Sequence, residues 1–323
     1  MSIKKIIDCI KTYNSFLITT HHNLEGDALG SEIAFYYLLK KLGKTAVMVN
    51  QDCTPEEYAF LNGAERIKIY KPNLSLKYDV LVFLDCSTKS RCGSVSDLAG
   101  AAKFIINIDH HISNEKYGDI NWVKPNASSV SEMIYELYKN MHIKIDNQVA
   151  LALYVGILTD TGSFRYINTN FYTHEIVAEL LKFNLDASKI YRNIYESVPY
   201  SDILLLSRIF LTLRRHASGK IIVFEMRRNL LKGREIHFDL TEHVLNFGRL
   251  IREYKVCVLF RELEGKERQI RVNLRSQGEV DVNRIAQFFG GGGHKTAAGC
   301  TLLGNLQSVK RRVINKIRQQ LLA

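Results

Sequence analysis

Proline and paired cysteines are scarce in this sequence. Four prolines occur in 323 residues, and no low-complexity run is present. Long disordered linkers have a strongly biased composition, so this composition argues against them. The six cysteines form no CxxC pair and no regular framework, and we expect free thiols in a reducing cytoplasm. They are Cys9, Cys53, Cys86, Cys92, Cys257 and Cys300.

Long apolar runs are also missing. No stretch approaches the roughly 20 apolar residues that a membrane-spanning helix needs. The first ten residues place Ile3, Ile6, Ile7 and Ile10 at helical spacing between charged residues. This pattern predicts an amphipathic helix rather than a signal peptide. We therefore expect a cytoplasmic protein with no membrane partner.

The remaining composition is that of an ordinary globular protein, except for its charge. Hydrophobic residues make up 46% and charged residues 24% of the chain, which is long enough for two domains. Residues 211–323 hold 22 Lys and Arg against 10 Asp and Glu, whereas residues 1–210 hold 22 against 23. A basic surface favours anionic partners such as nucleic acid or nucleotides. The alternative is a solvated basic face, which also describes the last helix, where Lys310, Arg311 and Arg312 oppose an apolar side.

Apolar segments of strand and helix length alternate along the chain. Strands are expected over residues 15–20, 45–50, 79–84, 104–108, 220–225, 255–262 and 269–274. Helices are expected over residues 32–41, 130–141, 147–158, 201–215, 282–289 and 306–322. This alternation predicts an α/β fold with a doubly wound, mostly parallel sheet.

Acidic and imidazole side chains follow several of these apolar runs. The run Phe104–Ile108 ends in Asp109, His110 and His111, which taken alone could be only a polar turn. In α/β sheets, however, ligands gather at the carboxyl ends of strands. Three further segments deliver such side chains just past an apolar run, namely His21, Glu25 and Asp27, then Asp85, and then Asp160.

Carboxylates with a minority of imidazoles suit Mn²⁺ or Mg²⁺ better than structural zinc. The number of candidate ligands exceeds the needs of one ion. It suits two ions spaced roughly 3.5–4 Å apart, as in phosphatases and nucleases. The sequence therefore predicts a site for two divalent ions, two Mn²⁺ or two Mg²⁺.

The strings THHNLEGDALGS, LVFLDCS, NIDHH and GILTDTGSFRY, in this order, resemble the four motifs of the DHH phosphoesterases. The string VNLRSQGEVDVNRIAQFFGGGGHKTAAG resembles the signature of the DHH-associated C-terminal domain. The resemblance covers nearly the whole chain. It is strongest to the branch of two-domain nano-RNases and pAp phosphatases, which includes stand-alone cyclic di-AMP phosphodiesterases.

The resemblance implies a ligand set. One metal would be held by His21, Glu25 and Asp85, and the second by Asp27, Asp85, His110 and Asp160, with Asp85 between them. The family commonly has Asp where Glu25 stands and Pro where Leu24 stands. Glutamate is one methylene longer but keeps the charge and the donor atoms, so we expect a tolerated change of ligand.

Other residues have implied roles beside the metals. Two dications would lower the pKa of a shared water, so that hydroxide attacks phosphorus in line and the ribose 3′-oxygen leaves. Asp109 would orient a neighbouring imidazole, and His111 would contact the scissile phosphate or serve only as a structural hydrogen-bond partner. Arg91 and Arg165 could add phosphate contacts or be ordinary surface residues.

The C-terminal glycine run predicts a second part of the site. Glycine lets the backbone approach a ligand closely, and exposed amides there would cradle a terminal phosphate, although a flexible turn is the alternative. The substrate-binding residues implied are Arg275, Ser276, Gly291, Gly292, Gly293 and His294. We expect a catalytic metal-binding domain over residues 1–195, a linker helix over 196–215 and a smaller α/β substrate-binding domain over 216–323, with the active-site cleft between the domains.

The implied function is a Mn²⁺-dependent phosphodiesterase for very short substrates: cyclic di-AMP, pApA and other dinucleotides, or nanoRNA. The main alternative is a phosphatase that removes the 3′-phosphate of pAp. A pyrophosphatase, with similar N-terminal ligands in a related branch, and a nucleotide-binding protein without catalysis are weaker alternatives. A homodimer is expected from the family alone.

Overall fold

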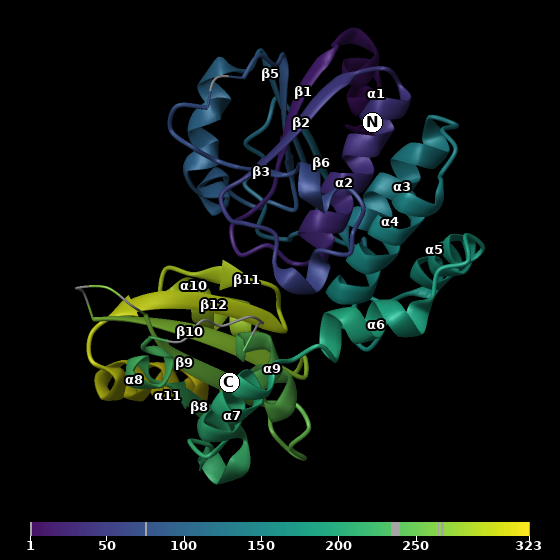
Figure 1. Cartoon of the computed structure of the whole chain (residues 1–323). Coiled ribbons are helices and arrows are strands. Elements are labelled where there is room, and N and C mark those ends of the chain that lie inside the picture. Colours follow the sequence, from purple (N-terminus) through teal and green to yellow (C-terminus); the bar gives the residue numbers. More distant parts are fainter. Residues whose placement is uncertain (1, 75, 234–239, 264, 266–267, 323) are drawn as a thin grey trace. The chain divides into compact units, whose positions relative to one another are not determined.

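The computed structural model describes residues 2–74, 76–233, 240–263, 265 and 268–322, and the chain divides into two compact units. The first unit is Met1–Ser197 and the second is Val198–Ala323. Each unit is built on its own six-stranded sheet (Figure 1). The prediction of an α/β protein with a parallel sheet and a second, smaller α/β part is confirmed.

The sheet of the first unit is parallel throughout. Its strand order is β3-β2-β1-β4-β5-β6. The strands are β1 (Ser15–Thr19), β2 (Thr45–Asn50), β3 (Lys68–Ile69), β4 (Val80–Leu84), β5 (Phe104–Asp109) and β6 (Ile120–Val123). The chain winds from β1 outward to β3, then returns to the other side of β1 and winds outward from β4 to β6. This is the doubly wound arrangement, and its switch point lies between β1 and β4.

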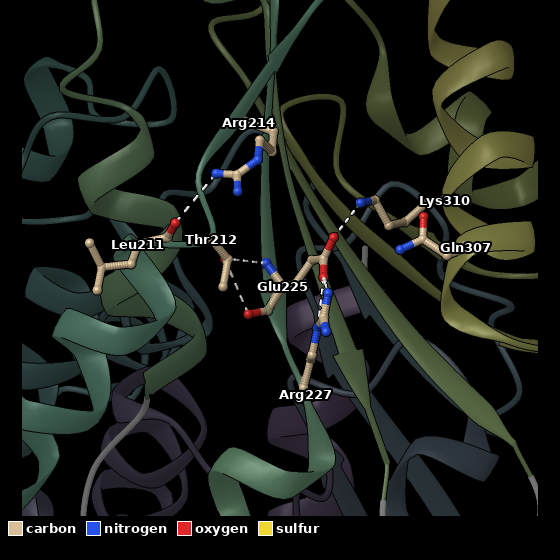
Figure 2. A pocket seen from close by; sticks show the side chains of 7 residues that line it. All are labelled: Leu211, Thr212, Arg214, Glu225, Arg227, Gln307 and Lys310. Atoms are coloured by element: carbon tan, nitrogen blue, oxygen red, sulfur yellow. Dashed lines mark hydrogen bonds and ion pairs between the residues drawn. The ribbon is translucent and has the colours of Figure 1, made fainter.

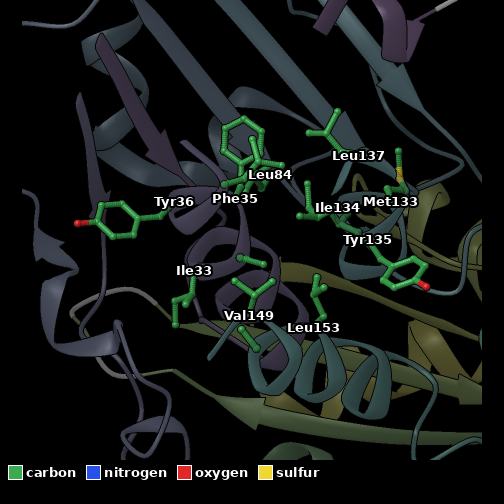
Figure 3. Packing of buried hydrophobic residues seen from close by; sticks show 14 of the residues in the cluster. Ile33, Phe35, Tyr36, Leu84, Met133, Ile134, Tyr135, Leu137, Val149 and Leu153 are labelled. Atoms are coloured by element: carbon green, nitrogen blue, oxygen red, sulfur yellow. The ribbon is translucent and has the colours of Figure 1, made fainter. Parts of the chain in front are cut away.

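Successive residues of a strand point to opposite faces of the sheet, so each face has its own core cluster. Helices cover one of these faces. Phe16 and Ile18 of β1 pack into the larger core cluster, whereas Leu17 points into a smaller cluster on the other face. The larger cluster contains side chains of α2 (Gly26–Lys41), α3 (Val130–Asn140) and α4 (Asn147–Asp160), which Figure 3 shows together with Leu84 of β4. The smaller cluster lies under the 3₁₀ segment η3 (Lys89–Ala101).

Within its described residues, the first unit has five further helical segments. They are α1 (Ser2–Thr12), η1 (Glu56–Tyr58), η2 (Ala64–Arg66), α5 (Phe171–Leu181) and α6 (Ala187–Tyr195). Strands β3 and β6 were not predicted, because two and four residues are too short to show an alternating pattern.

Helices α2 and α4 approach each other closely through glycines. A Cβ on Gly30 of α2 would lie 2.3 Å from the carbonyl oxygen of Ala152 in α4. A Cβ on Gly156 of α4 would lie 1.9 Å from Ser131 Oγ and 2.8 Å from Asp27 Oδ1. A side chain at Gly30 would meet backbone and one at Gly156 would meet the side chains of Ser131 and Asp27, so either substitution would force these groups apart. The close contact brings the start of α2 next to the end of α4.

The second unit has a mixed sheet in the order β11-β12-β10-β9-β8-β7. Only β8 and β9 are parallel, and the other pairs are antiparallel. The strands are β7 (Arg214–His216), β8 (Ile221–Met226), β9 (Val256–Glu262), β10 (Gln269–Ser276), β11 (Gly292–Gly293) and β12 (Ala297–Leu303). Two core clusters, one on each face, contain side chains of α10 (Val282–Phe288) and α11 (Leu306–Leu322), and of α7 (Tyr200–Phe210) and α9 (Leu240–Gly248). The short segments η4 (Ala217–Gly219) and α8 (Arg228–Leu231) complete this unit.

The helix expected over residues 201–215 ends earlier than predicted. Helix α7 stops at Phe210, and Arg214 and Arg215 pair with β8 as part of strand β7. The hydroxyl of Thr212 accepts a hydrogen bond from the amide of Glu225 (2.8 Å), which fastens the chain to β8 just past the helix. This long-range bond is invisible in the sequence, where the apolar period continues to Leu213. Among the described residues, no helix is long and apolar enough to cross a membrane.

Candidate metal centre

The carboxyl ends of three neighbouring strands meet at the switch point of the parallel sheet. His21 lies two residues beyond β1, Asp85 follows β4 directly, and β5 ends at Asp109. Strand β4 pairs with both β1 and β5, so these side chains emerge side by side. Polar residues on three adjacent strand ends therefore lie together at one edge of the sheet, where the sequence predicts a site.

One group of possible ligands consists of His21, Glu25 and Asp85, whose ligand atoms lie within 4.8 Å of one another. Nε2 of His21 lies 3.2 Å from Asp85 Oδ2 and 3.4 Å from Glu25 Oε1. The other ring nitrogen, Nδ1, lies 2.8 Å from the carbonyl oxygen of His22. Because a carbonyl only accepts, Nδ1 carries a proton and donates it, and Nε2 is the atom directed at the carboxylates.

A second group consists of Asp27, His110 and Asp160, again with ligand atoms within 4.8 Å. Nε2 of His110 lies 3.4 Å from Asp160 Oδ2 and 3.7 Å from Asp85 Oδ1. Its Nδ1 lies 3.1 Å from the carbonyl oxygen of Ala127. As in His21, Nδ1 therefore donates to a backbone carbonyl and Nε2 is directed at the carboxylates. Asp85 therefore has one oxygen beside each histidine.

Asp85 is the most distinctive side chain of the centre. It is buried, and its backbone adopts the left-handed conformation at φ 54°, which is uncommon for a residue other than glycine and often marks a functional site. Within the described part of the chain, Oδ1 accepts no hydrogen bond. Two ring nitrogens, His111 Nδ1 and His110 Nε2, lie 3.4 Å and 3.7 Å from it. A buried carboxylate oxygen that accepts no hydrogen bond favours a cation beside it, and the surrounding donors are the oxygen and imidazole atoms that divalent ions prefer. The residues therefore fit a divalent metal centre.

The two histidines have strongly raised pKa values. Burial lowers the pKa of His21, but its hydrogen bonds with Asp85 and Glu25 outweigh burial and raise it to about 10. Burial likewise lowers the pKa of His110, and the charges of Asp160 and Asp85 raise it to about 10. In the metal-free protein both rings are therefore imidazolium at neutral pH. Their positive charges neutralise the same carboxylates that a metal cation would neutralise.

Asp27 is held by the first amides of helix α3. Its Oδ2 accepts from the amide of Val130 (2.6 Å) and its Oδ1 from the amide of Ser131 (2.9 Å). The positive end of the helix dipole favours a carboxylate there. Burial and the neighbouring charge of Asp85 nevertheless raise the pKa of Asp27 to about 7. The acids of this centre thus repel one another without metal.

Asp160 reaches the centre from a helix and not from a strand end. It is the last residue of α4, the helix that the sequence predicts over residues 147–158. The glycine contact between α2 and α4 explains its position, since Asp27 lies in the first turn of α2. Burial raises the pKa of Asp160 well above its ordinary value.

Asp109 is fully hydrogen-bonded within the chain. Its Oδ1 accepts from the amides of His110 (2.8 Å) and His111 (3.2 Å) and lies 2.7 Å from His111 Nδ1, and its Oδ2 accepts from Asn114 Nδ2 (2.6 Å). Burial raises the pKa of Asp109, but the contact with His111 outweighs it and keeps that pKa low. On the other side of the ring, Arg91 Nη1 lies 3.3 Å from His111 Nε2. Arginine only donates, so His111 accepts from Arg91 at Nε2 and donates to Asp109 from Nδ1.

Two asparagines support the centre, and the sequence reasoning did not find them. Asn114 joins Asp109 to Asn107 by a 2.8 Å bond. Asn168 donates to the carbonyl oxygens of Asp160 (3.0 Å) and Ser128 (2.8 Å). Asn114 follows His111 by three residues and Asn168 follows Asp160 by eight. Asparagine is so common in loops that a single sequence does not distinguish these two from ordinary loop residues.

The candidate substrate residues of the second unit lie at β10 and the turn before β12. Arg275 Nη2 forms a 2.6 Å ion pair with Glu242 Oε2, and the buried Ser276 hydroxyl donates to the carbonyl oxygen of Val280 (2.7 Å). His294 closes a tight turn by donating its amide to Ala297 (2.7 Å). Ser276 therefore shapes a turn, whereas Arg275 carries a charge that remains available to an anion only in competition with Glu242.

The glycine run forms a hairpin edge rather than a row of exposed amides. A Cβ on Gly291 would lie 2.1 Å from the carbonyl oxygen of Gly299, and one on Gly293 would lie 2.5 Å from that of Ala297. These two glycines are required by packing against β12. Gly292 has open space where its Cβ would stand, so it is the position at which a ligand could approach the backbone.

Comparisons with known proteins match both units. Residues 15–157 match the model of the DHH family, N-terminal domain, and residues 218–321 match that of the DHHA1 domain. A protein of Thermus thermophilus named bifunctional oligoribonuclease and PAP phosphatase NrnA is 31% identical over 310 residues, covering 94% of this chain and 89% of the relative. The Bacillus subtilis protein of the same name is 29% identical, covering 92% of each chain. A crystal structure of an exopolyphosphatase-related protein from Bacteroides fragilis superimposes with a TM-score of 0.87 at 25% identity, covering 99% of this chain and 95% of that one.

Proposed function

The chain belongs to the DHH family of metal-dependent phosphoesterases, and from this premise we propose that it is a Mn²⁺-dependent phosphodiesterase for very short nucleotide substrates. Its substrates would be pApA and other dinucleotides, nanoRNA or cyclic di-AMP, and its products mononucleotides. The relatives named oligoribonuclease support the short-RNA part of this proposal. Membership of a family of hydrolases removes the alternative of a nucleotide-binding protein without catalysis.

The arrangement around Asp85 carries the proposal. Its Oδ2 faces His21 and its Oδ1 faces His110, so one carboxylate stands between two groups of ligand atoms. We assign His21, Glu25 and Asp85 to a first metal, and Asp27, Asp85, His110 and Asp160 to a second. When bound, two divalent cations supply an acidified water as nucleophile and neutralise the charge of the phosphoryl oxygens.

The protein's own residues orient this centre and the substrate. The carbonyl oxygens of His22 and Ala127 fix which ring nitrogen of His21 and of His110 is presented. Asp109 fixes His111, and Arg91 approaches the same ring from the other side. We assign the scissile phosphate to the neighbourhood of His111 and Arg91, where the guanidinium compensates the negative charge of the phosphate. Asp109 is then a positioning residue.

The second unit would bind the part of the substrate that does not react. Arg275 and His294 supply the side chains, Gly292 permits backbone approach, and Ser276, Gly291 and Gly293 shape the turn that carries them. Arg275 would exchange its ion pair with Glu242 for a substrate phosphate, because a guanidinium binds carboxylate and phosphate oxygens alike.

A product-resolved assay tests the proposal. Purified protein loaded with Mn²⁺ is incubated with pApA, cyclic di-AMP, a five-nucleotide RNA, pAp and pyrophosphate, and each product is separated. We expect mononucleotides from at least one of the first three substrates, and loss of that activity in Asp85→Asn. The proposal fails if all three remain intact, or if the variant releases the same products at the same rate. Parallel reactions with Mg²⁺ test the metal preference.

A second candidate is removal of the 3′-phosphate from pAp as the main reaction. The names of the Thermus and Bacillus relatives, which include PAP phosphatase, favour it. A larger kcat/KM for pAp than for pApA would establish this order, and the reverse would establish the phosphodiesterase. Cytoplasmic location and a homodimer stay predictions from the sequence.

A further inference from the structure

A hollow in the second unit is lined by polar and charged side chains that have no part in the metal centre. Its volume is about 370 Å³, within the range of small-molecule sites. We call it the Glu225 pocket (Figure 2). Apart from Leu211, its lining residues are Thr212, Arg214, Glu225, Arg227, Gln307 and Lys310. They come from the end of α7, from β7 and β8, and from the start of α11.

The pocket holds three cationic side chains and one acid. Glu225 is 7% exposed, and its Oε2 accepts from Arg227 Nε (3.0 Å) and Nη2 (2.8 Å). Its Oε1 pairs with Lys310 Nζ, as the dashed lines of Figure 2 show. One carboxylate neutralises one of the three positive charges. It also holds Arg227 and Lys310 in fixed positions, so the remaining positive charge is localised beside the hollow.

The Arg214 side chain is hydrogen-bonded to the backbone just past the end of helix α7. Its Nη1 donates to the carbonyl oxygens of Leu213 (2.7 Å) and Leu211 (3.4 Å). These bonds involve one of its three nitrogens and do not neutralise its charge, because both acceptors are neutral. Within the described part of the chain, no carboxylate forms an ion pair with Arg214, so its positive charge stays beside the pocket.

Neighbouring features make the same region favourable for an anion. At the start of α11, Asn305 Oδ1 accepts from the amide of Ser308 (2.8 Å). Gln307 and Lys310 lie in the first two turns of this helix, near the positive end of its dipole. Burial lowers the pKa of the adjacent His216, and the positive charges of Lys310 and Arg318 lower it further. Several like charges held together in this way are stabilised when an anion binds among them.

We propose that the Glu225 pocket, whose lining residues all belong to the second unit, binds a phosphate group of a nucleotide or of an RNA chain. Arg214, Lys310 and Gln307 would contact the phosphate oxygens, and Glu225 would keep Lys310 and Arg227 in position. The choice of a nucleotide phosphate rests on the proposed function, whereas the affinity for phosphate follows from the pocket itself.

The test uses the full chain in EDTA, where binding is measured without hydrolysis. Affinities for AMP and for a five-nucleotide RNA are compared between wild type and Arg214→Ala. Among the described residues, the hydrogen bonds lost in this variant are those to backbone carbonyls. Arg311→Ala is the matched control, since Arg311 neighbours Lys310 on α11 but is exposed and outside the pocket lining. Gln307→Glu is a second variant, because it adds a negative charge at the rim without removing a structural contact.

We expect Arg214→Ala and Gln307→Glu each to weaken binding by roughly five- to tenfold. For RNA, the slope of log Kd against log salt should fall by about one in Arg214→Ala and stay unchanged in Arg311→Ala. Weakened AMP binding would identify a mononucleotide as the ligand, and weakened RNA binding alone would identify the RNA backbone. The proposal is overturned if both pocket variants bind AMP and RNA as the control does. Because no turnover is measured, this outcome is independent of whether pApA is hydrolysed.

Discussion

At the scale of single residues, the centre depends on how each imidazole is held. His21 and His110 both donate Nδ1–H to a backbone carbonyl, and both direct Nε2 toward carboxylates. His111 instead donates Nδ1–H to Asp109. The side chain of Asp109 is satisfied by hydrogen bonds within the chain, whereas Asp85 Oδ1 accepts none within the described residues. Two neighbouring acids of the same motif set thus have different roles.

Asp109→Asn and Asp85→Asn should therefore fail in different ways. Asp85→Asn should lose metal and activity together, because the carboxylate shared by both ligand groups is gone. Asp109→Asn should keep two bound ions but lose roughly 10- to 100-fold in kcat, because His111 is no longer oriented by a charge. Metal content by mass spectrometry, read beside kcat, separates the two. Equal metal loss in both variants would show that Asp109 is itself a ligand.

Metal binding should strengthen as the pH rises. The raised pKa values of His21 and His110, both about 10, mean that each ring holds a proton on Nε2 at neutral pH without metal. A metal ion must displace that proton, so apparent affinity should rise by about tenfold per pH unit for each proton released. Chelator competition between about pH 6 and pH 8 measures this slope. An affinity independent of pH would mean that the metal-free rings are neutral.

Glu32 should make stability depend on pH through its burial. Burial raises its pKa from 4.5 to about 8, although the hydrogen bond from Asn50 lowers it. The folded state binds the proton of Glu32 more tightly than the unfolded state does. Protonated Glu32 therefore adds to the free energy of unfolding below about pH 4.5, and this stabilisation is lost as the pH rises toward about 8. Glu32→Gln should remove a loss of up to about 1.4 kcal/mol per pH unit in that window. Urea unfolding at several pH values checks this, and parallel pH curves for the two proteins would contradict it.

At the scale of secondary-structure elements, the glycine contact between α2 and α4 sets the distance between Asp27 and Asp160. Gly156→Ala would push a methyl group into Ser131 and toward Asp27. We expect a loss of roughly 1–3 kcal/mol in the free energy of unfolding and weaker metal binding. Gly100→Ala is the matched control, because nothing lies within 4 Å of that position. Denaturant unfolding and metal titration should separate the two variants, and identical results would rule out the packing explanation.

The long elements and the position of candidate ligands near strand ends could be predicted from the sequence, because their signals are local. The run Val80–Leu84 is apolar throughout and Asp85 follows it directly, and His21 comes two residues after β1. The placement of Asp160 could not be predicted in the same way, since it depends on how closely α4 packs on α2. The end of α7 depends on a bond between Thr212 and Glu225, thirteen residues apart, which no local pattern reports.

At the scale of the whole molecule, the division of charge corresponds to a division into two units. The basic residues beyond position 210 fall within the second unit, and three of them, Arg214, Arg227 and Lys310, line the Glu225 pocket. The basic excess could be read from the sequence. The meeting of Arg214, Arg227 and Lys310 around one buried acid could not, because it requires the pairing of β7 with β8 and the docking of α11.

The proposed function depends on two divalent cations bound in one site with Asp85 between them. Anomalous diffraction from Mn²⁺-soaked crystals measures this most directly. We predict two peaks roughly 3.5–4 Å apart. One should lie beside His21 and Glu25 and the other beside Asp27, His110 and Asp160, with one oxygen of Asp85 bonded to each or one shared. A single peak, or two peaks that Asp85 does not contact, would contradict the account.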